Sequence, residues 1–458
     1  MLITGGGIQL RVLPRCVPAV IVTLRQPGTI LIDHLFRLRA NGTDVRTEVV
    51  AGLTTFLTMS YILFVNPAIL SSTGMDKGAV FVATCLAAAI GSGVMAFVAN
   101  WPVGMAPGMG LNAFFAFVVV GGMGFGWQQA LGAVFISGLV FLALTVTGIR
   151  AWLIGGIPTS LRSAIVAGIG LFLAIIALSS AGIVVAHPAT KITLGNLHES
   201  SVLYAIFGFF VIASLDALKV RGAILMGILA VTILATLMGH NAFAGIFAAP
   251  PSLTPTFLQM DVAGALKGGL FSVILVFVLV EVFDATGTLI GVARAAGLIR
   301  PDGSSNLGRA LFADSTAIIV GATLGTSSTT AFIESAAGVQ AGGRTGLTAL
   351  VIALLFLAAL FVSPLAGSVP AYATAPALLY VAALMIREFK EIQWDDVTES
   401  VPAALTALAM PFTYSIANGL AFGFISYVLL KALTGQWRSL HPATCVVAAL
   451  FLIKFAYF

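Results

Sequence analysis

Three acidic side chains lie in stretches of sequence that are otherwise apolar, and they are the residues most able to do chemistry. Glu281 and Asp284 stand three positions apart in F-V-L-V-E-V-F-D-A-T-G-T-L-I-G, so a helix would place both on one face. Glu334 stands in S-S-T-T-A-F-I-E-S-A-A-G. Burial in a low dielectric favours the protonated form of a carboxyl group, so such a group can take up a proton and a ligand N–H in a coupled way. The alternative for each residue is a structural carboxyl that hydrogen bonds between helices.

A side-chain amide and several aromatic rings accompany these acids. Asn112 follows the glycine-rich run G-M-A-P-G-M-G-L, and its amide can both donate and accept. A planar heterocycle with ring N–H and C=O edges needs that combination, together with an apolar or aromatic wall. Phe114, Phe115 and Phe332 could stack on such a ring, although ordinary packing also explains each of them. The residues alone indicate a site for a small polar or anionic solute.

The composition indicates that these residues lie in a membrane. Of 458 residues, 59% are hydrophobic and 9% charged, and the mean hydropathy is +1.08, whereas a soluble domain carries about a quarter charged residues. Apolar runs of about 20 residues, long enough to cross a bilayer as helices, follow one another nearly to the C-terminus. Only helices and closed barrels satisfy their backbone in lipid, and runs this long are helical. We therefore expect an all-α polytopic membrane protein.

Other classes of protein fit the sequence less well. The sequence pI is about 9.2, but the basic residues are scattered through short loops and form no stripe, so no nucleic-acid partner is expected. Cys16, Cys85 and Cys445 lie far apart and show no metal or disulfide spacing. The histidines fall in loops or at segment ends, so we expect no metal centre, no cofactor and no enzyme active site.

Hydrophobic runs between glycine, proline and charge breaks predict about fourteen membrane segments. Their expected ranges are 49–70, 79–99, 104–121, 128–148, 160–180, 201–216, 222–239, 268–292, 310–324, 327–340, 346–363, 370–386, 398–414 and 417–433. With a cytoplasmic N-terminus, most Lys and Arg residues, Arg150 among them, fall in inner loops, and Lys77, Lys191 and Lys267 fall in outer loops. Charge does not decide whether a last apolar run, 441–457, lies along the membrane or adds a pass. Residues 1–33 are expected to be a disordered or non-native extension.

Two of the expected segments begin with sequence that is unsuited to a continuous helix. V-G-M-A-P-G-M-G-L-N opens the third segment and G-A-T-L-G-T-S-S-T-T precedes the tenth. Irregular backbone at membrane depth survives only inside the protein or beside a watery cavity. Third and tenth are equivalent places in two halves of about seven segments, and an odd number of passes inverts one half relative to the other. Such paired breaks indicate a binding site near the bilayer midplane, where the half-helices after Gly110 and Thr330 would point N–H groups into it. Close helix packing at small residues is the alternative reading of both breaks.

Several long stretches of the sequence resemble one known family. They are T-E-V-V-A-G-L-T-T-F-L-T-M-S-Y-I-L-F-V-N-P-A-I-L at 47–70, G-M-A-P-G-M-G-L-N-A-F-F-A-F at 104–117, F-D-A-T-G-T-L at 283–289, T-S-S-T-T-A-F-I-E-S-A-A-G-V at 326–339 and M-P-F-T-Y-S-I-A-N-G at 410–419. The similarity to the azaguanine-type purine permeases, the hypoxanthine, guanine and adenine branch of the nucleobase:cation symporters, runs from about residue 34 to the end.

The resemblance implies a particular architecture and mechanism. It implies two inverted repeats, a core domain from 34–148 and 263–365, and a gate domain from 149–262 and 366–458, with the core moving against the gate like an elevator. Asp284 and Glu334 would hold a purine and couple it to protons. The remaining implied site residues are Gly110 and Asn112, which would complete the pocket, and Thr288 and Ser335, which would tune the choice of base. The residues themselves, apart from the resemblance, add Glu281 as a candidate proton-coupling carboxyl and Phe332 as a candidate wall of the site.

The resemblance therefore implies a proton symporter that imports purine bases across the bacterial inner membrane, with pairing of two copies through their gate domains left open. One alternative is a carrier of uracil, xanthine or a small anion on the same architecture. An anion carrier is expected to use a cation, or half-helix dipoles alone, at its site. No Lys or Arg stands near the centre of a broken segment, and two carboxylates disfavour an anion. A membrane-embedded enzyme is a remote alternative, because no catalytic constellation is evident.

Overall fold

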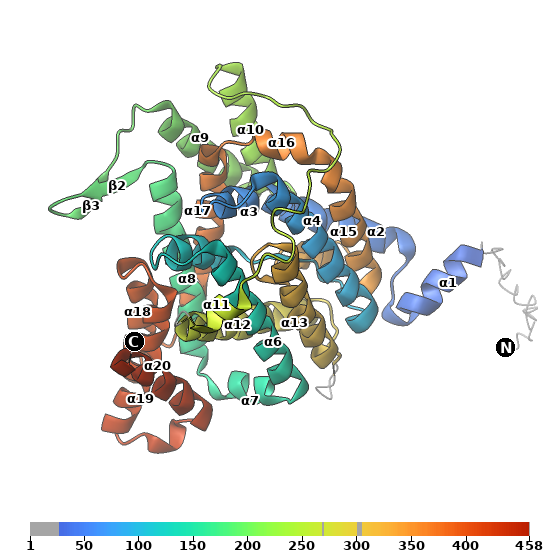
Figure 1. Ribbon diagram of the computed structural model, residues 1–458. Coiled ribbons are helices and arrows are strands. Elements are labelled where there is room, and N and C mark those ends of the chain that lie inside the picture. The colour runs from blue at the N-terminus through green and yellow to red at the C-terminus, as the bar shows by residue number, and fades with distance from the viewer. Residues whose placement is uncertain (1–26, 268–269, 300–304, 458) are drawn as a thin grey trace, which may run out of the picture.

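The fold is almost entirely helical, as the composition predicted, and Figure 1 shows it in the computed structural model. Residues 27–267, 270–299 and 305–457 are described. The elements of the first half are α1 Pro27–Phe36, α2 Val45–Met59, α3 Ile62–Ser71, α4 Lys77–Val94, β1 Met105–Pro107, α5 Met109–Ala113, α6 Trp127–Val146, α7 Ile149–Gly156, α8 Thr159–Ser180, β2 Val184–His187, β3 Lys191–Leu194, α9 Ser200–Ala217 and α10 Ala223–Leu237. Single π-helical stretches, Met95–Ala99 and Phe114–Val120, continue α4 and α5.

The second half repeats the pattern of long helices around one break. Its elements are α11 Val262–Lys267, α12 Phe271–Ala295, α13 Leu307–Leu324, β4 Thr329–Ala331, α14 Ser335–Gln340, α15 Gly346–Ala359, α16 Ser363–Ser368, α17 Ala371–Ile386, α18 Val397–Phe412, α19 Ile416–Leu433 and α20 Pro442–Tyr457. Each predicted segment contains helical residues at its expected place. Within the described part of the chain, nine helical stretches are long and apolar enough to cross a bilayer. The total of about fourteen passes stays a prediction.

The N-terminal region differs from its prediction. Residues 1–26 lie outside the described residues, but Pro27–Phe36 forms helix α1, so the expectation of disorder is wrong for 27–33. Phe36 is buried in a small apolar cluster with Leu347 of α15, and its carbonyl accepts a hydrogen bond from Asn100 Nδ2 at 3.0 Å. These contacts fasten α1 to the rest of the fold because they bury an aromatic ring and pair a backbone carbonyl.

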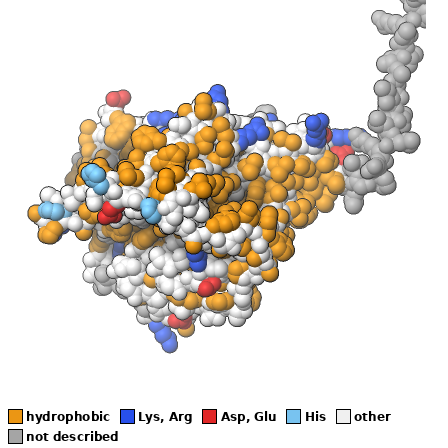
Figure 2. All heavy atoms as spheres, turned by 90° about the horizontal axis from the view of Figure 1, so that it is seen from above, with side chains coloured by type: hydrophobic (Ala, Val, Ile, Leu, Met, Phe, Trp, Pro, Cys, Tyr) orange, Lys and Arg blue, Asp and Glu red, His pale blue; other side chains and the backbone are white. Residues whose placement is uncertain are grey.

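The helices pack in two groups. Helices α2–α6 and α12–α15, here called the site group, pack mainly on one another, and α8–α10 with α17–α19 form a second set, here called the outer group. The groups meet where α3 lies on α17, α5 on α8, and α12 on α8 and α19. The segment between α10 and α11 crosses back to the site group, since Leu258 N donates to Thr323 O at 2.9 Å. Figure 2 shows hydrophobic side chains over much of one face with scattered charged groups, as lipid contact requires.

The two broken segments pair with each other inside the site group. Strands β1 and β4 are antiparallel, with Met105 opposite Ala331 and Pro107 opposite Thr329. Gly108 N donates to Ser328 O at 2.8 Å, and Phe332 N donates to the Gly104 carbonyl at 3.0 Å. These residues are buried, so each break satisfies backbone groups that the other leaves without a helical partner. The prediction of irregular backbone at both places is confirmed.

A carboxylate from α2 caps the start of α15. Glu48 is buried, and its side chain accepts hydrogen bonds from Arg344 N at 2.8 Å, Thr348 N at 3.2 Å and Thr348 Oγ1 at 2.6 Å. The first N–H groups of a helix have no intrahelical acceptor and carry partial positive charge, so a carboxylate stabilises them. This contact joins α2, the first helix of the site group, to α15, its last helix.

Replacing Glu48 with alanine is expected to destabilise the protein by about 2 kcal/mol, because it leaves buried N–H groups without an acceptor. The measurement is the thermal unfolding midpoint of the detergent-solubilised protein. Glu199→Ala is the control, since Glu199 directly precedes α9 and its side chain makes no capping hydrogen bond. Equal midpoints for the two variants would contradict this account of Glu48.

Candidate functional site

The β1–β4 crossing lies beside α12, and this arrangement gathers the acidic residues that the sequence singled out. Ser328 Oγ, just before β4, donates to Glu281 Oε1 at 2.5 Å. Asp284 lies one helical turn further along α12, and α12 packs against both β4 and α14, between which Glu334 stands. The structure therefore brings Glu281, Asp284 and Glu334 into one region, although two of them belong to α12 and the third follows β4.

Glu334 is held by a residue from the break between α2 and α3. The Tyr61 hydroxyl donates to Glu334 Oε1 at 2.7 Å, and the Tyr61 ring centroid lies 6.5 Å from that of Phe332. Glu334 and Asp284 are partly exposed, whereas Tyr61 and Phe332 are buried. Both residues therefore keep part of their surface uncovered beside two buried aromatic rings.

The face of α12 beyond Asp284 is also uncovered at two glycines. An added Cβ at Gly287 would meet no atom within 4 Å, and one at Gly291 would meet only the end of Ile333 at 4.0 Å. Gly287 and Gly291 are exposed, and they lie one and two turns beyond Asp284. A helix face that carries a carboxyl group is expected to avoid lipid, and this strip of α12 beyond Asp284 is not covered by other side chains.

Gly110 lies where the two helix groups meet beside the site. It is the second residue of α5 and is partly exposed. A Cβ built at Gly110 would stand 2.7 Å from Ile169 Cγ2 of α8, which is closer than real side-chain contacts allow. Glycine at this position therefore permits the outer group to approach the break.

Asn112 and Ser335 occupy different surroundings from those expected. Asn112 is buried: its Nδ2 donates to Asn66 Oδ1 at 2.6 Å, and its Oδ1 accepts from Ser327 Oγ. Ser335 Oγ accepts from Gly104 N at 3.0 Å. Their polar atoms thus join the two broken segments to each other and to α3, and contact of either residue with a ligand stays a prediction. Thr288 is nearly buried on the same face of α12 as Asp284.

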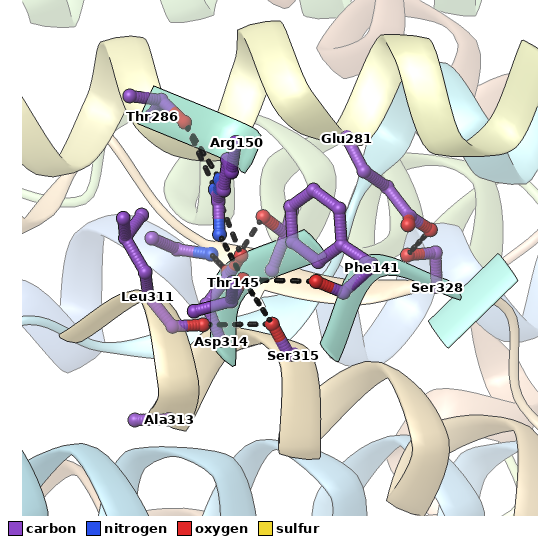
Figure 3. A network of polar contacts seen from close by, with 12 residues as sticks. Phe141, Thr145, Arg150, Glu281, Thr286, Leu311, Ala313, Asp314, Ser315 and Ser328 are labelled. Carbon is purple, nitrogen blue, oxygen red and sulfur yellow. Dashed lines mark hydrogen bonds and ion pairs between the residues drawn. The ribbon is translucent and has the colours of Figure 1, made fainter. Parts of the chain in front are cut away.

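Two charged residues of this region were missed. Asp314 of α13 is buried, and its Oδ1 accepts from Thr330 Oγ1 at 3.1 Å and from Ala331 N at 3.2 Å. Arg150 was predicted in an inner loop, which is wrong: it is 1% exposed, and its Nη2 lies 3.6 Å from Asp314 Oδ2 (Figure 3). Asp314 stands within a predicted apolar segment, so the rule applied to Glu281 would have found it. Arg150 follows the end of a segment, and no local pattern distinguishes it from a loop residue.

Comparison with known proteins identifies the family. Residues 46–422 match the model of the Permease family, Xan_ur_permease. The chain belongs to this family. The permease is 50% identical over 436 residues to the adenine permease AdeP of Escherichia coli (strain K12), covering 95% of this chain and 98% of that one. It is 45% identical over 435 residues to the guanine/hypoxanthine permease PbuG of Bacillus subtilis (strain 168), covering 92% and 98%. The predicted resemblance to purine permeases is confirmed.

A solved structure supports the fold of the permease. The transmembrane domain of the cyanobacterium bicarbonate transporter BicA superposes with a TM-score of 0.63 at 16% identity, covering 81% of this chain and 97% of that one. At this identity the likeness concerns the fold alone. The predicted helical, inverted-repeat membrane fold is confirmed.

Replacing Gly110 with alanine is expected to lower the rate of transport about tenfold or more, because the new methyl group would collide with Ile169. Initial uptake rate, normalised to the amount of protein in the membrane, is the measurement. Ile169→Ala in the same chain should restore part of the rate by making room. Gly93→Ala is the matched control, since a Cβ there meets nothing within 4 Å. If the Gly110 and Gly93 variants transport equally well, the close approach of Ile169 to Gly110 is not needed for transport.

Proposed function

We propose that this permease imports purine nucleobases together with protons. The observation that carries the proposal is the 50% and 45% identity, over nearly the whole of both chains, to proteins named as adenine and guanine/hypoxanthine permeases. The partly exposed Asp284 and Glu334 beside Tyr61 and Phe332 support it, since they supply acidic groups and aromatic rings at one place.

The chemistry of two neighbouring carboxyl groups suits a purine and a proton. An ionised carboxyl accepts from a ring or amino N–H, and a protonated one also donates to a ring nitrogen or a carbonyl oxygen. Two carboxylates that share a poorly solvated site resist being ionised together, so proton uptake at one favours ligand binding by the other. In this scheme Asp284 and Glu334 hold the base, and Glu281, which is buried and whose Oε2 has no hydrogen-bond partner, is a further proton site.

Alternating access would be a movement of the site group against the outer group. In this proposal the predicted core (34–148 and 263–365), which contains the site group, moves against the predicted gate (149–262 and 366–458), which contains the outer group. Their contacts beside the site are apolar: Gly110 faces Ile169, and the Phe283 and Phe424 rings stack with centroids 6.4 Å apart. Apolar contacts of this kind can re-form in a new register without leaving buried polar groups unpaired.

The proposed setting is the bacterial inner membrane with a cytoplasmic N-terminus, as the distribution of Lys and Arg favours. A second copy would pair through the outer group, where α9 presents exposed Leu203, Phe207 and Phe210. Transport of another nucleobase or of a small anion is the alternative. The charge of Arg150 is paired with Asp314, so the site offers an anion no free cation among the described residues.

Substitution of Glu334 by glutamine is expected to reduce uptake of radiolabelled adenine and hypoxanthine at least about tenfold. The reason is that an amide, unlike a carboxyl group, neither ionises nor takes up and releases a proton. The assay uses a host that lacks its own purine transporters, and immunoblotting of membranes controls for abundance. Glu199→Gln, at an exposed position before α9, is the matched control. Wild-type uptake by the Glu334 variant would remove this carboxyl from the mechanism.

Collapse of the proton gradient by a protonophore is expected to abolish accumulation of purine against its concentration gradient, while equilibration continues. The measurement is the steady-state ratio of internal to external substrate in membrane vesicles. Accumulation driven by a sodium gradient alone would assign a different coupling ion. Competition with the uptake of radiolabelled purine tests the alternative substrates. Unlabelled adenine, guanine or hypoxanthine should inhibit that uptake, whereas unlabelled uracil, xanthine and bicarbonate should not.

A further inference from the structure

A buried ion pair lies behind the proposed substrate face of α12. Arg150 is 1% exposed and Asp314 0% exposed. Arg150 binds Thr286, which stands two residues after Asp284 and therefore on nearly the opposite side of the helix. Figure 3 shows the guanidinium between α12 and α13, with Asp314 and Thr145 close to it. The ion pair is thus near the proposed site but on the side of α12 that faces away from Asp284.

The guanidinium is held from three helices. Nε and Nη2 donate to Thr286 Oγ1 at 3.2 and 2.9 Å, and Nη1 donates to Thr145 Oγ1 of α6 at 3.5 Å. The Cζ atom stands 3.9 Å from the centroid of the Phe141 ring, a cation–π contact. Nη2 completes the set at 3.6 Å from Asp314 Oδ2. Because a buried cation needs such compensation, Arg150 has one defined position.

Asp314 connects this cation to strand β4, which shortly precedes Glu334. Its Oδ1 accepts from Thr330 Oγ1 and from Ala331 N, the last two residues of β4. Glu334 follows Ala331 by three residues. A displacement of Asp314 would therefore move the end of β4, and with it the backbone that places the Glu334 carboxyl against Tyr61.

We propose that Asp314 and Arg150 are positioning residues for the substrate site. Asp314 fixes the end of β4, and Arg150 holds Asp314 in place. The inference rests on the proposed function for what the site binds. The competing view is that the pair merely holds α6, α12 and α13 together, in which case its loss would change the amount of folded protein but leave substrate affinity alone.

Paired substitutions separate the two roles of Asp314. R150M leaves the buried Asp314 carboxyl without its cationic partner, and D314A removes the acceptor of the Ala331 N–H. The double variant R150M/D314N has no charges but keeps a side-chain oxygen that can accept from Ala331, whereas R150M/D314A has neither charge nor acceptor. Positioning through β4 predicts that D314N rescues R150M and that D314A does not.

The first readout is purine uptake across substrate concentrations in the full-length protein, with KM and maximal rate corrected for membrane abundance. R150M, D314A and R150M/D314A should raise KM about tenfold or more, and R150M/D314N should stay within about threefold of wild type. K431M is the matched control: Lys431 is also buried, 4% exposed, and pairs with Glu399 at 3.0 Å in the outer group. It should lower abundance without raising KM.

The second readout needs no substrate. Amide hydrogen exchange of residues 326–334 in detergent should be faster than wild type in D314A and R150M/D314A and near wild type in R150M/D314N. Unchanged exchange and KM in D314A, or equal values for the two double variants, would overturn the positioning role. If wild-type protein takes up no purine but exchange follows the expected order, the proposed substrate fails while the anchoring of β4 stands.

Discussion

The demand that every backbone group be paired inside a bilayer governs the centre of this fold. Two segments lose helical structure at membrane depth, and each leaves N–H and C=O groups that lipid cannot satisfy. Strands β1 and β4 solve the problem by pairing with each other, and the Gly104 N–H finds Ser335 Oγ. The two halves of the chain must therefore meet at this crossing, whatever the rest of the helices do. The residues that follow β4, including Glu334, acquire their position from it.

The same crossing explains how several acids can share one interior region. A buried carboxyl needs donors, and the breaks supply them: Ser328 for Glu281, and Thr330 with the Ala331 N–H for Asp314. Tyr61, from a third interruption between α2 and α3, does the same for Glu334. Irregular backbone is costly in a membrane, but it leaves hydroxyl and N–H groups free to donate to a carboxyl. In a continuous helix those groups would be hydrogen-bonded within the helix. Acidic residues and broken segments therefore occur together for a physical reason.

Sequence reasoning found the features that are local. Glycine-rich runs marked both breaks, and an acid in an apolar run marked Glu281, Asp284 and Glu334, because each signal lies within about ten residues of chain. What it missed depends on partners far away in sequence. Arg150 looked like a loop residue because Asp314 and Thr286, which bind it, lie more than a hundred positions later. Asn112 likewise binds Asn66, 46 positions earlier, and Ser327, 215 positions later.

Helix α7 occupies a special place between the two helix groups, since its two ends belong to different groups. Arg150 in its first turn is tied to Thr286 and Asp314 in the site group. At its other end the Gly156 carbonyl accepts from Thr444 Oγ1 of α20 at 2.6 Å, and α20 packs on α19 of the outer group. The proposed movement of the site group against the outer group would then be absorbed within these eight residues or at their last contacts. The predicted domain boundary at residue 149 separates Arg150 from the helices that hold it, so in the proposed movement the joint would lie beyond the first turn of α7.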